Sequence, residues 1–282
     1  MNVFNTKQIF LSDELGRSDK ERILEYVVGN KILEVGSGSG IHLNMLEDAF
    51  PQAQIQGIDI SDTVVHALQM KKQCENRRWN IQQGNATELN FNEKFDTIIF
   101  CSVLHEVFSY QSKWGKFSYR PLEEALVKAF SLLNKGGRII IRDGVMSSDD
   151  SMILIRFLNP DGVNFLQQYC DDFKGRDIPY IKVYKNEVHM KMNDAMEFLY
   201  TYTWGYEAYQ CEVQEQYGYL TKEGYEKFVN ILWGESTQIK YSNSYLQDGY
   251  TKALKSKVKF IDIDGEEIPL PNSNYLLVVE KL

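Results

Sequence analysis

Residues 33–40, LEVGSGSG, place three alternating glycines directly after a short apolar run. The preceding segment KILEV (31–35) has the composition of a buried β-strand, and IHLNMLEDAF (41–50) has the apolar spacing of a helix. Glycines between a strand and a helix allow a tight turn and a close approach of the backbone to a ligand. The stretch therefore predicts a strand–turn–helix unit that holds a nucleotide, without deciding which one.

The same alternation continues to residue 144. We expect a first helix over 18–30, where Ser18 and Glu21 fit a capping box. Further strands are expected at 53–60, 80–86, 95–104 and 138–144, with helices over 61–77 and 120–137. Alternating strands and helices predict a parallel sheet covered on both faces, with ligands bound beyond the carboxyl ends of the strands.

Past Gly144 the alternation breaks. Residues 145–218 are polar and aromatic with weaker periodicity, which predicts an inserted lid. The α/β pattern resumes with a helix over 221–233 and strands over 236–245 and 274–282, and a hairpin around Asp264-Gly265 is expected near 258–270. We therefore predict three parts: residues 1–144 as the first part of the core, 145–218 as the lid, and 219–282 as the rest of the core.

The composition excludes several classes of protein. The net charge of −8 argues against a broad nucleic-acid surface, which needs clustered Lys and Arg. No run of about 18 apolar residues exists, so no membrane span is expected. The N-terminus is too polar for a signal peptide, and the four cysteines form no CxxC pair. These features favour a cytoplasmic protein.

Three details around the glycines narrow the choice of ligand. The G-x-G-x-G spacing meets neither the dinucleotide fingerprint nor the phosphate-loop pattern. Glu34, just before the turn, would repel a pyrophosphate but suits an ammonium group. Asp59 ends the second strand, where an acid can accept both hydroxyls of a ribose, and Asn85 ends the third strand, where it could meet an adenine edge. An adenosine that carries an ammonium and a carboxylate, but no phosphate, is S-adenosylmethionine.

In order along residues 18–144, LEVGSGSG, GIDIS (57–61), GNA (84–86), FDTIIFCSVLHEV (95–107) and LLNKGGRIIIRDG (132–144) resemble the motifs of class I S-adenosylmethionine-dependent methyltransferases. The resemblance implies a Rossmann-like α/β fold with a doubly wound, mostly parallel seven-stranded sheet and an antiparallel last strand. It implies that the donor's methionine part meets the first motif and that its ribose and adenine meet the next two. The implied cofactor residues are Glu34, Gly36, Ser37, Gly38 and Gly40 for the methionine part, Asp59, Ile60, Asn85 and Ala86 for the nucleoside, and Cys101 and Ser102 at the fourth strand.

The methyl acceptor is expected near the end of the fourth strand. His105 is the candidate base because its pKa suits neutral pH, and Glu106 and Tyr110 could orient or replace it. The alternative is that His105 is a structural histidine. Cys101 is expected to pack in the core, since neither the Pro-Cys of cytosine methylation nor the (D/N)PPY signature of exocyclic-amine methylation is present.

Candidate substrate-binding residues lie in the fifth strand and the lid. Arg142 could hold an acidic substrate or pair with Asp143 or Glu106. The aromatic residues at 200, 202, 204 and 206 have period two, so a strand with one aromatic face is conceivable, and an aromatic pocket suits a small, partly apolar molecule. The same aromatics could instead form the lid's own core or the interface of a homodimer. The candidates are Arg142, Tyr202, Trp204, Gln214 and Tyr217.

The sequence predicts no metal site, because the acid pairs at 149–150 and 171–172 have no matching acids on the fourth strand.

The predicted function is methyl transfer from S-adenosylmethionine to an oxygen or nitrogen of a small molecule under an aromatic lid. A tRNA, rRNA or protein methyltransferase is the alternative, and a non-catalytic module that binds the cofactor is the third reading.

Overall fold

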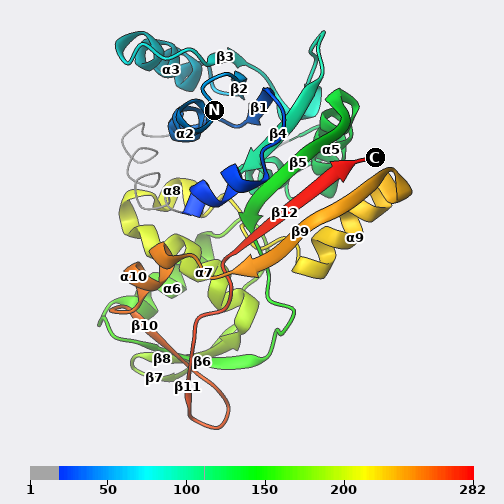
Figure 1. The fold of residues 1–282 in the computed structure, drawn as a ribbon. Helices are drawn as coiled ribbons and strands as arrows, with labels where there is room; N and C mark the ends of the chain where they lie inside the picture. Colours follow the sequence, from blue (N-terminus) through cyan, green and yellow to red (C-terminus); the bar gives the residue numbers. More distant parts are fainter. Residues whose placement is uncertain (1–18, 111) are drawn as a thin grey trace.

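The computed structural model describes residues 19–110 and 112–282 and divides into two stacked parts, each built on one sheet (Figure 1). The first sheet has seven strands in the order β3-β2-β1-β4-β5-β12-β9. Its strands are β1 (Lys31–Val35), β2 (Gln54–Asp59), β3 (Asn80–Gln83), β4 (Phe95–Cys101), β5 (Leu133–Gly144), β9 (Thr237–Tyr245) and β12 (Asn274–Lys281). The pairs from β3 to β5 are parallel, whereas β12 is antiparallel to both β5 and β9. The predicted mostly parallel sheet with an antiparallel last strand is therefore confirmed.

Helices cover both faces of this sheet, because consecutive strand residues point to opposite sides. Ile98 packs in one core cluster and Ile99 in the other, and Leu277 and Leu276 divide in the same way. One face carries α2 (Ile41–Ala49), α3 (Asp62–Cys74) and the 3₁₀ helix η1 (Glu21–Tyr26). The other carries α4 (Leu104–Ser109), α5 (Tyr119–Leu132), α9 (Lys222–Trp233) and the short η2 (Ala86–Glu88).

The start of the chain differs from the expected helix over 18–30. Only a short helical segment forms, and it ends at Tyr26. The proposed cap Ser18 lies outside the described residues. Among those residues, no helix is both long and apolar enough to cross a lipid bilayer.

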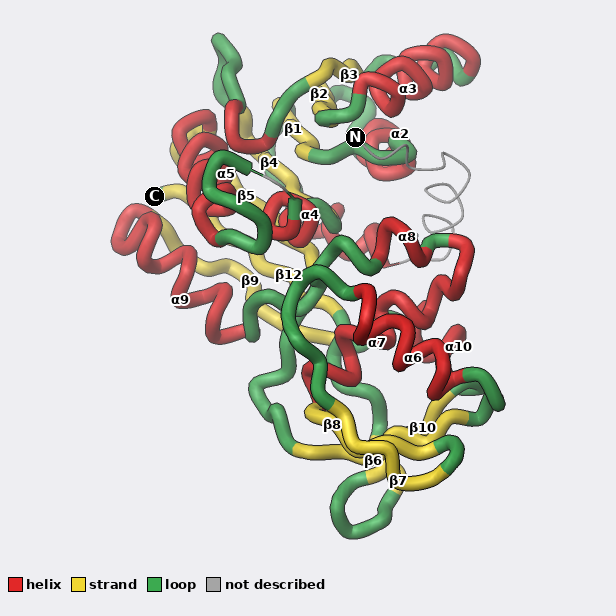
Figure 2. Tube along the Cα trace, turned by 180° about the vertical axis from the view of Figure 1, so that it is seen from behind, coloured by secondary structure: helices red, strands yellow, loops and turns green. Residues whose placement is uncertain are grey.

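The second part contains a five-stranded sheet in the order β11-β10-β6-β8-β7, and its helices lie between the two sheets in both views (Figures 1 and 2). The strands are β6 (Met152–Phe157), β7 (Tyr180–Tyr184), β8 (Glu187–Lys191), β10 (Val258–Ile261) and β11 (Glu267–Ile268). The helices are α6 (Gly162–Asp172), α7 (Met192–Trp204), α8 (Tyr209–Glu212) and α10 (Asp248–Leu254), and the short 3₁₀ turns are η3 (Gly205–Glu207) and η4 (Gly234–Ser236), the latter after α9.

The predicted division of the chain needs one correction. We expected residues 219–282 to complete the core, and the hairpin of β10 and β11 does form within 258–270. However, β10 pairs with β6, where Phe260 lies opposite Ile155, and its apolar residues pack in the core of the second part. Burial of those residues therefore assigns the hairpin and α10 to the lid, which we call the lid subdomain (145–218 and 248–268).

The conceivable aromatic strand around residues 200–206 is a helix instead. Residues 192–204 form α7, in which Ala195, Phe198, Leu199 and Tyr202 all face the core of the lid subdomain. Their spacing of three and four residues is helical, and it outweighs the period-two spacing of the aromatics.

Tyr200 connects the lid subdomain to the core sheet. Its buried hydroxyl donates a hydrogen bond of 2.6 Å to the carbonyl of Ser273, just before β12. Tyr200→Phe is expected to lower the free energy of unfolding by about 1 kcal/mol, because one buried hydrogen bond is lost. Urea denaturation measures the change. Tyr206→Phe, at an exposed hydroxyl, is the matched control and should change stability by less than about 0.5 kcal/mol; equal effects would contradict the role of the Tyr200 bond.

Candidate functional site

The glycine turn between β1 and α2 is tied to the end of β2. Gly36, Gly38 and Gly40 all have positive φ values, which other residues rarely adopt. The Gly36 and Ser37 amides donate to the carbonyl of Ile58, at 2.9 and 3.1 Å. A side chain at position 36 would also meet Val103, since an added Cβ would lie 2.5 Å from its Cγ2. The turn therefore holds the backbone of β1 close to the loop after β4.

A cleft of about 510 Å³ opens beside this turn, at the carboxyl ends of the parallel strands. Seven of the predicted site residues line it: Gly36, Asp59, Ile60, Asn85, Ala86, Glu106 and Tyr110. The other predicted residues of the glycine turn and of β4 do not line it. This is the edge of the sheet where an α/β protein binds its ligand.

The groups around the cleft fit an adenosine with an ammonium group. Both carboxylate oxygens of Asp59 accept hydrogen bonds from backbone amides: Oδ2 from Gly38 at 3.0 Å and Oδ1 from Ser61 at 2.9 Å. Each oxygen keeps a second lone pair that can accept a further hydrogen bond. Burial raises the pKa of this carboxyl. Glu34 is buried, with Oε1 2.7 Å from His42 Nδ1. Its Oε2 has no hydrogen-bond partner among the described residues, as expected of an acceptor that awaits a donor.

The remaining predicted cofactor residues have structural contacts of their own. The Asn85 Oδ1 accepts from the Thr87 amide at 3.0 Å and so caps η2. Cys101 is buried, and burial raises the pKa of its thiol. The Ser102 amide donates to the carbonyl of Arg142 at 2.7 Å, which joins the ends of β4 and β5.

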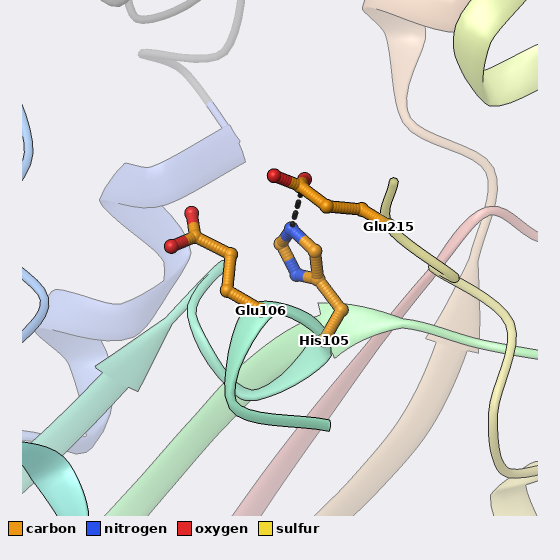
Figure 3. Close-up of side chains that lie close together, drawn as sticks. All are labelled: His105, Glu106 and Glu215. Atoms are coloured by element: carbon orange, nitrogen blue, oxygen red, sulfur yellow. Dashed lines mark ion pairs between the residues drawn. The ribbon is translucent and has the colours of Figure 1, made fainter. Parts of the chain in front are cut away.

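His105 lies on α4, directly behind the cleft wall, and Asp143 at the end of β5 holds its ring. The Asp143 Oδ1 lies 2.6 Å from His105 Nδ1, and its Oδ2 accepts from the His105 backbone amide at 3.0 Å. On the other side of the ring, Nε2 lies 3.6 Å from Glu215 Oε2. Figure 3 shows the ring of His105 directed at the Glu215 carboxylate, with Glu106 beside it on the same helix.

The lid subdomain completes this cluster. The ring of Tyr217 stacks on His105 with centroids 4.4 Å apart. Its hydroxyl donates to Glu212 at 2.9 Å and lies 3.2 Å from Glu215. Glu215 also accepts a hydrogen bond from Tyr110 of the core. The structure thus brings the predicted residues His105, Glu106, Tyr110 and Tyr217 to one place.

The cluster is rich in acids, and their proximity changes their pKa values. Burial and then the nearby Glu215 hold the pKa of Glu106 well above its ordinary value. Burial and Glu215 likewise raise the pKa of Glu212 to about 8. Burial alone would lower the pKa of His105, but Asp143 and Glu215 outweigh it and hold this pKa well above its usual range.

Four other predicted residues do not reach the cleft. Arg142 is buried and pairs with Asp19 rather than with Asp143 or Glu106, and it also donates to Ser102 and Gln247. Tyr202 packs against aromatic rings in the core of the lid subdomain. Trp204 and Gln214 are half-buried within the same subdomain, outside the cleft lining.

Two residues of the cluster, Asp143 and Glu215, are not among the predicted site residues. Asp143 could have been found, because β4 and β5 are neighbours and Cys101 lies opposite Arg142, so the residue after Arg142 meets the start of α4. No pattern in the sequence indicates that Glu215 lies near the start of α4. Its position depends on how the lid subdomain packs on the core, 105 residues away from Tyr110.

Comparisons with known proteins show similarity to methyltransferases. Residues 33–139 match the model of a methyltransferase domain family. The tRNA1(Val) (adenine(37)-N6)-methyltransferase of Porphyromonas gingivalis is 27% identical over 121 residues, which are 39% of this chain and 48% of that protein. The chain thus spans about half the length of this curated relative.

Solved structures show the same fold over nearly the whole chain. An S-adenosylmethionine-dependent methyltransferase from Clostridium acetobutylicum has a TM-score of 0.54 at 14% identity, with 98% of both chains covered. The glycopeptide N-methyltransferase MtfA, in complex with S-adenosyl-L-homocysteine, has a TM-score of 0.51 at 12% identity, with 95% of this chain and 90% of that chain covered. Residues 33–139 therefore match a methyltransferase domain, the fold of the chain is Rossmann-like, and the cofactor is S-adenosylmethionine.

Proposed function

We propose that this protein transfers the methyl group of S-adenosylmethionine to an oxygen or nitrogen of a small molecule. One observation carries the proposal: residues of the lid subdomain contact His105 and Tyr110 beside the cofactor cleft. Tyr217 stacks on His105, and Glu215 binds the hydroxyl of Tyr110, which lines the cleft. A methyl acceptor bound beside His105 and Tyr110 would be enclosed on one side by the cofactor domain and on the other by the lid subdomain.

The residues around the cleft would hold the donor along its length. We assign the ammonium group to the free oxygen of Glu34 and the rest of the methionine part to the glycine turn. We assign the ribose to Asp59 and Ile60, and the adenine to Asn85 and Ala86, with the backbone of Cys101 and Ser102 closing the base of the site. A carboxylate oxygen without a donor and a carboxylate with spare lone pairs support this assignment.

S-adenosylmethionine supplies a methyl group on a sulfonium, so the donor itself needs no further activation. The protein has to align the acceptor with that methyl group and remove the proton that the acceptor loses. Glu106 and Tyr110 line the cleft, and we propose that they contact the acceptor. His105 lies behind them and would orient them and share the proton through Glu215.

Two of the predicted substrate residues fit structural roles better. Arg142 is fully engaged with Asp19, Ser102 and Gln247, and Tyr202 belongs to the lid core. Tyr217 is the lid residue that we propose to face the acceptor. The four cysteines are free thiols in the structure, which fits a cytoplasmic acceptor.

The experiment is transfer of labelled methyl from S-adenosylmethionine to separated fractions of a host-cell extract, followed by mass spectrometry. We expect the label in the small-molecule fraction. The similarity to a tRNA methyltransferase makes tRNA the second candidate, although the (D/N)PPY signature is absent from the end of β4. Label in tRNA would favour that candidate, and binding of the cofactor without label in any fraction would indicate a module that only binds it.

A further inference from the structure

We propose that His105, Glu106 and Glu215 form a binding site for a divalent transition-metal ion, such as Zn²⁺ or Mn²⁺, at the acceptor end of the cleft. Each residue offers one ligand atom, and these atoms all lie within 4.8 Å of one another. Two of them come from α4 and the third from the lid subdomain (Figure 3). The sequence analysis predicts no metal site, and the third ligand, Glu215, is remote from the other two along the chain.

The ring of His105 is oriented in the way that is usual for a metal-binding histidine. Asp143 binds its Nδ1 at 2.6 Å and also accepts from its backbone amide, which fixes the ring. The opposite nitrogen, Nε2, is left facing the Glu215 carboxylate. A histidine that ligates a metal through one nitrogen usually donates the other N–H to a carboxylate or carbonyl. Asp143 is therefore the positioning residue of the proposed site.

The two carboxylates complement this ring. Glu215 is buried and oriented by the hydroxyls of Tyr110 and Tyr217. Glu106 lines the cleft, and no residue within 19–110 or 112–282 donates a hydrogen bond to its carboxylate. It is thus free to move the small distance that brings a carboxylate oxygen to about 2.0–2.2 Å from an ion.

The charges of the cluster around His105 also favour the binding of a cation. Asp143 and Glu215 are two acids beside the ring of His105, which can neutralise only one of them. Lys113, which lines the cleft, pairs with Glu124 at 2.8 Å, and Arg142 pairs with Asp19. A divalent ion would compensate the negative charge that remains.

The donor set defines the class of ion. One imidazole nitrogen and two carboxylate oxygens suit Zn²⁺, Mn²⁺ or Fe²⁺, and three protein ligands leave positions open for an exchangeable ligand. If the proposed function holds, that ligand is the acceptor's oxygen or nitrogen. The ion would favour its deprotonated form, the proton would leave to water in the cleft, and the new bond to the methyl carbon would form as the sulfonium bond breaks. The cluster would then act on the acceptor through the ion.

The test is metal binding by the full chain after treatment with a chelator, followed by calorimetric titration with Zn²⁺ and by visible absorption with Co²⁺. We expect about one ion per chain. Glu106→Gln and Glu215→Gln should each weaken binding by more than about 100-fold, because loss of even an outer-shell partner costs about 10–100-fold. Glu88→Gln is the matched control: it removes an exposed acid of the cleft lining that is not a ligand and should change affinity by less than about 3-fold.

Failure of the unmodified chain to bind Co²⁺ at millimolar concentration would overturn the site, and so would equal weakening by all three variants. The affinity of each variant for S-adenosylmethionine, measured on the same samples, verifies folding. A chain that binds the cofactor and methylates an acceptor without binding metal refutes only this inference. A chain that binds metal as expected but methylates nothing supports the site and refutes the proposed function.

Discussion

Asp59→Ala is expected to weaken the binding of S-adenosylmethionine by at least about 100-fold. If Asp59 accepts both ribose hydroxyls, its loss removes two hydrogen bonds to a charged group, each contributing about 1.5–3 kcal/mol, and 1.4 kcal/mol corresponds to tenfold in affinity. The substitution also frees the Gly38 amide, which Asp59 binds at 3.0 Å, so the glycine turn loses a support. Isothermal titration calorimetry with S-adenosylmethionine and with S-adenosylhomocysteine measures the loss.

Two further variants separate ligand contacts from charge and folding. Asp62→Ala removes an exposed acid three residues away, in the first turn of α3, and should leave affinity within about 2-fold. Asp59→Asn keeps one acceptor oxygen and the side-chain volume, so its loss should be intermediate. Unchanged affinity in Asp59→Ala would refute the assignment of the ribose to this acid, whatever the thermal stability of the variant.

The positions of the proposed cofactor-binding residues were predictable because their sequence signals are local. The glycine turn, Glu34 and Asp59 lie at the ends of two adjacent parallel strands, and a parallel α/β sheet always brings such ends to one edge. The sequence therefore locates these residues in space as soon as it predicts the strands. His105, Glu106 and Tyr110 follow β4 in the same manner and were predictable for the same reason.

The proposed acceptor site was less predictable because it depends on contacts between distant segments. Arg142 pairs with Asp19, 123 residues earlier, and no local pattern distinguishes that acid from the nearer Asp143. Tyr202 has the composition of a pocket residue, yet burial in the lid core decides its role. The β10–β11 hairpin was located correctly along the chain, but only packing shows which sheet it joins. In each case, contacts between distant segments decide between structural interpretations that the local sequence supports equally.

His105→Gln is expected to lower the rate of methyl transfer by at least about 100-fold while leaving the affinity for S-adenosylmethionine within about 3-fold. Removal of a group that handles the acceptor's proton typically costs 10²–10⁴ in rate. His105 does not line the cofactor cleft, so the donor should bind as before. Glutamine can still donate to Asp143, which avoids leaving that buried acid without a partner.

The rate is measured as single-turnover transfer of labelled methyl to the acceptor found in the extract experiment, at saturating cofactor. His66→Gln is the matched control, since His66 is an exposed histidine on α3 and its replacement should leave the rate unchanged. A His105→Gln enzyme that retains more than about a third of the rate would show that the imidazole neither handles the proton nor holds an ion that does. The ring would then only support the packing of Tyr217 against α4, and the proton would have to leave through Glu106 alone.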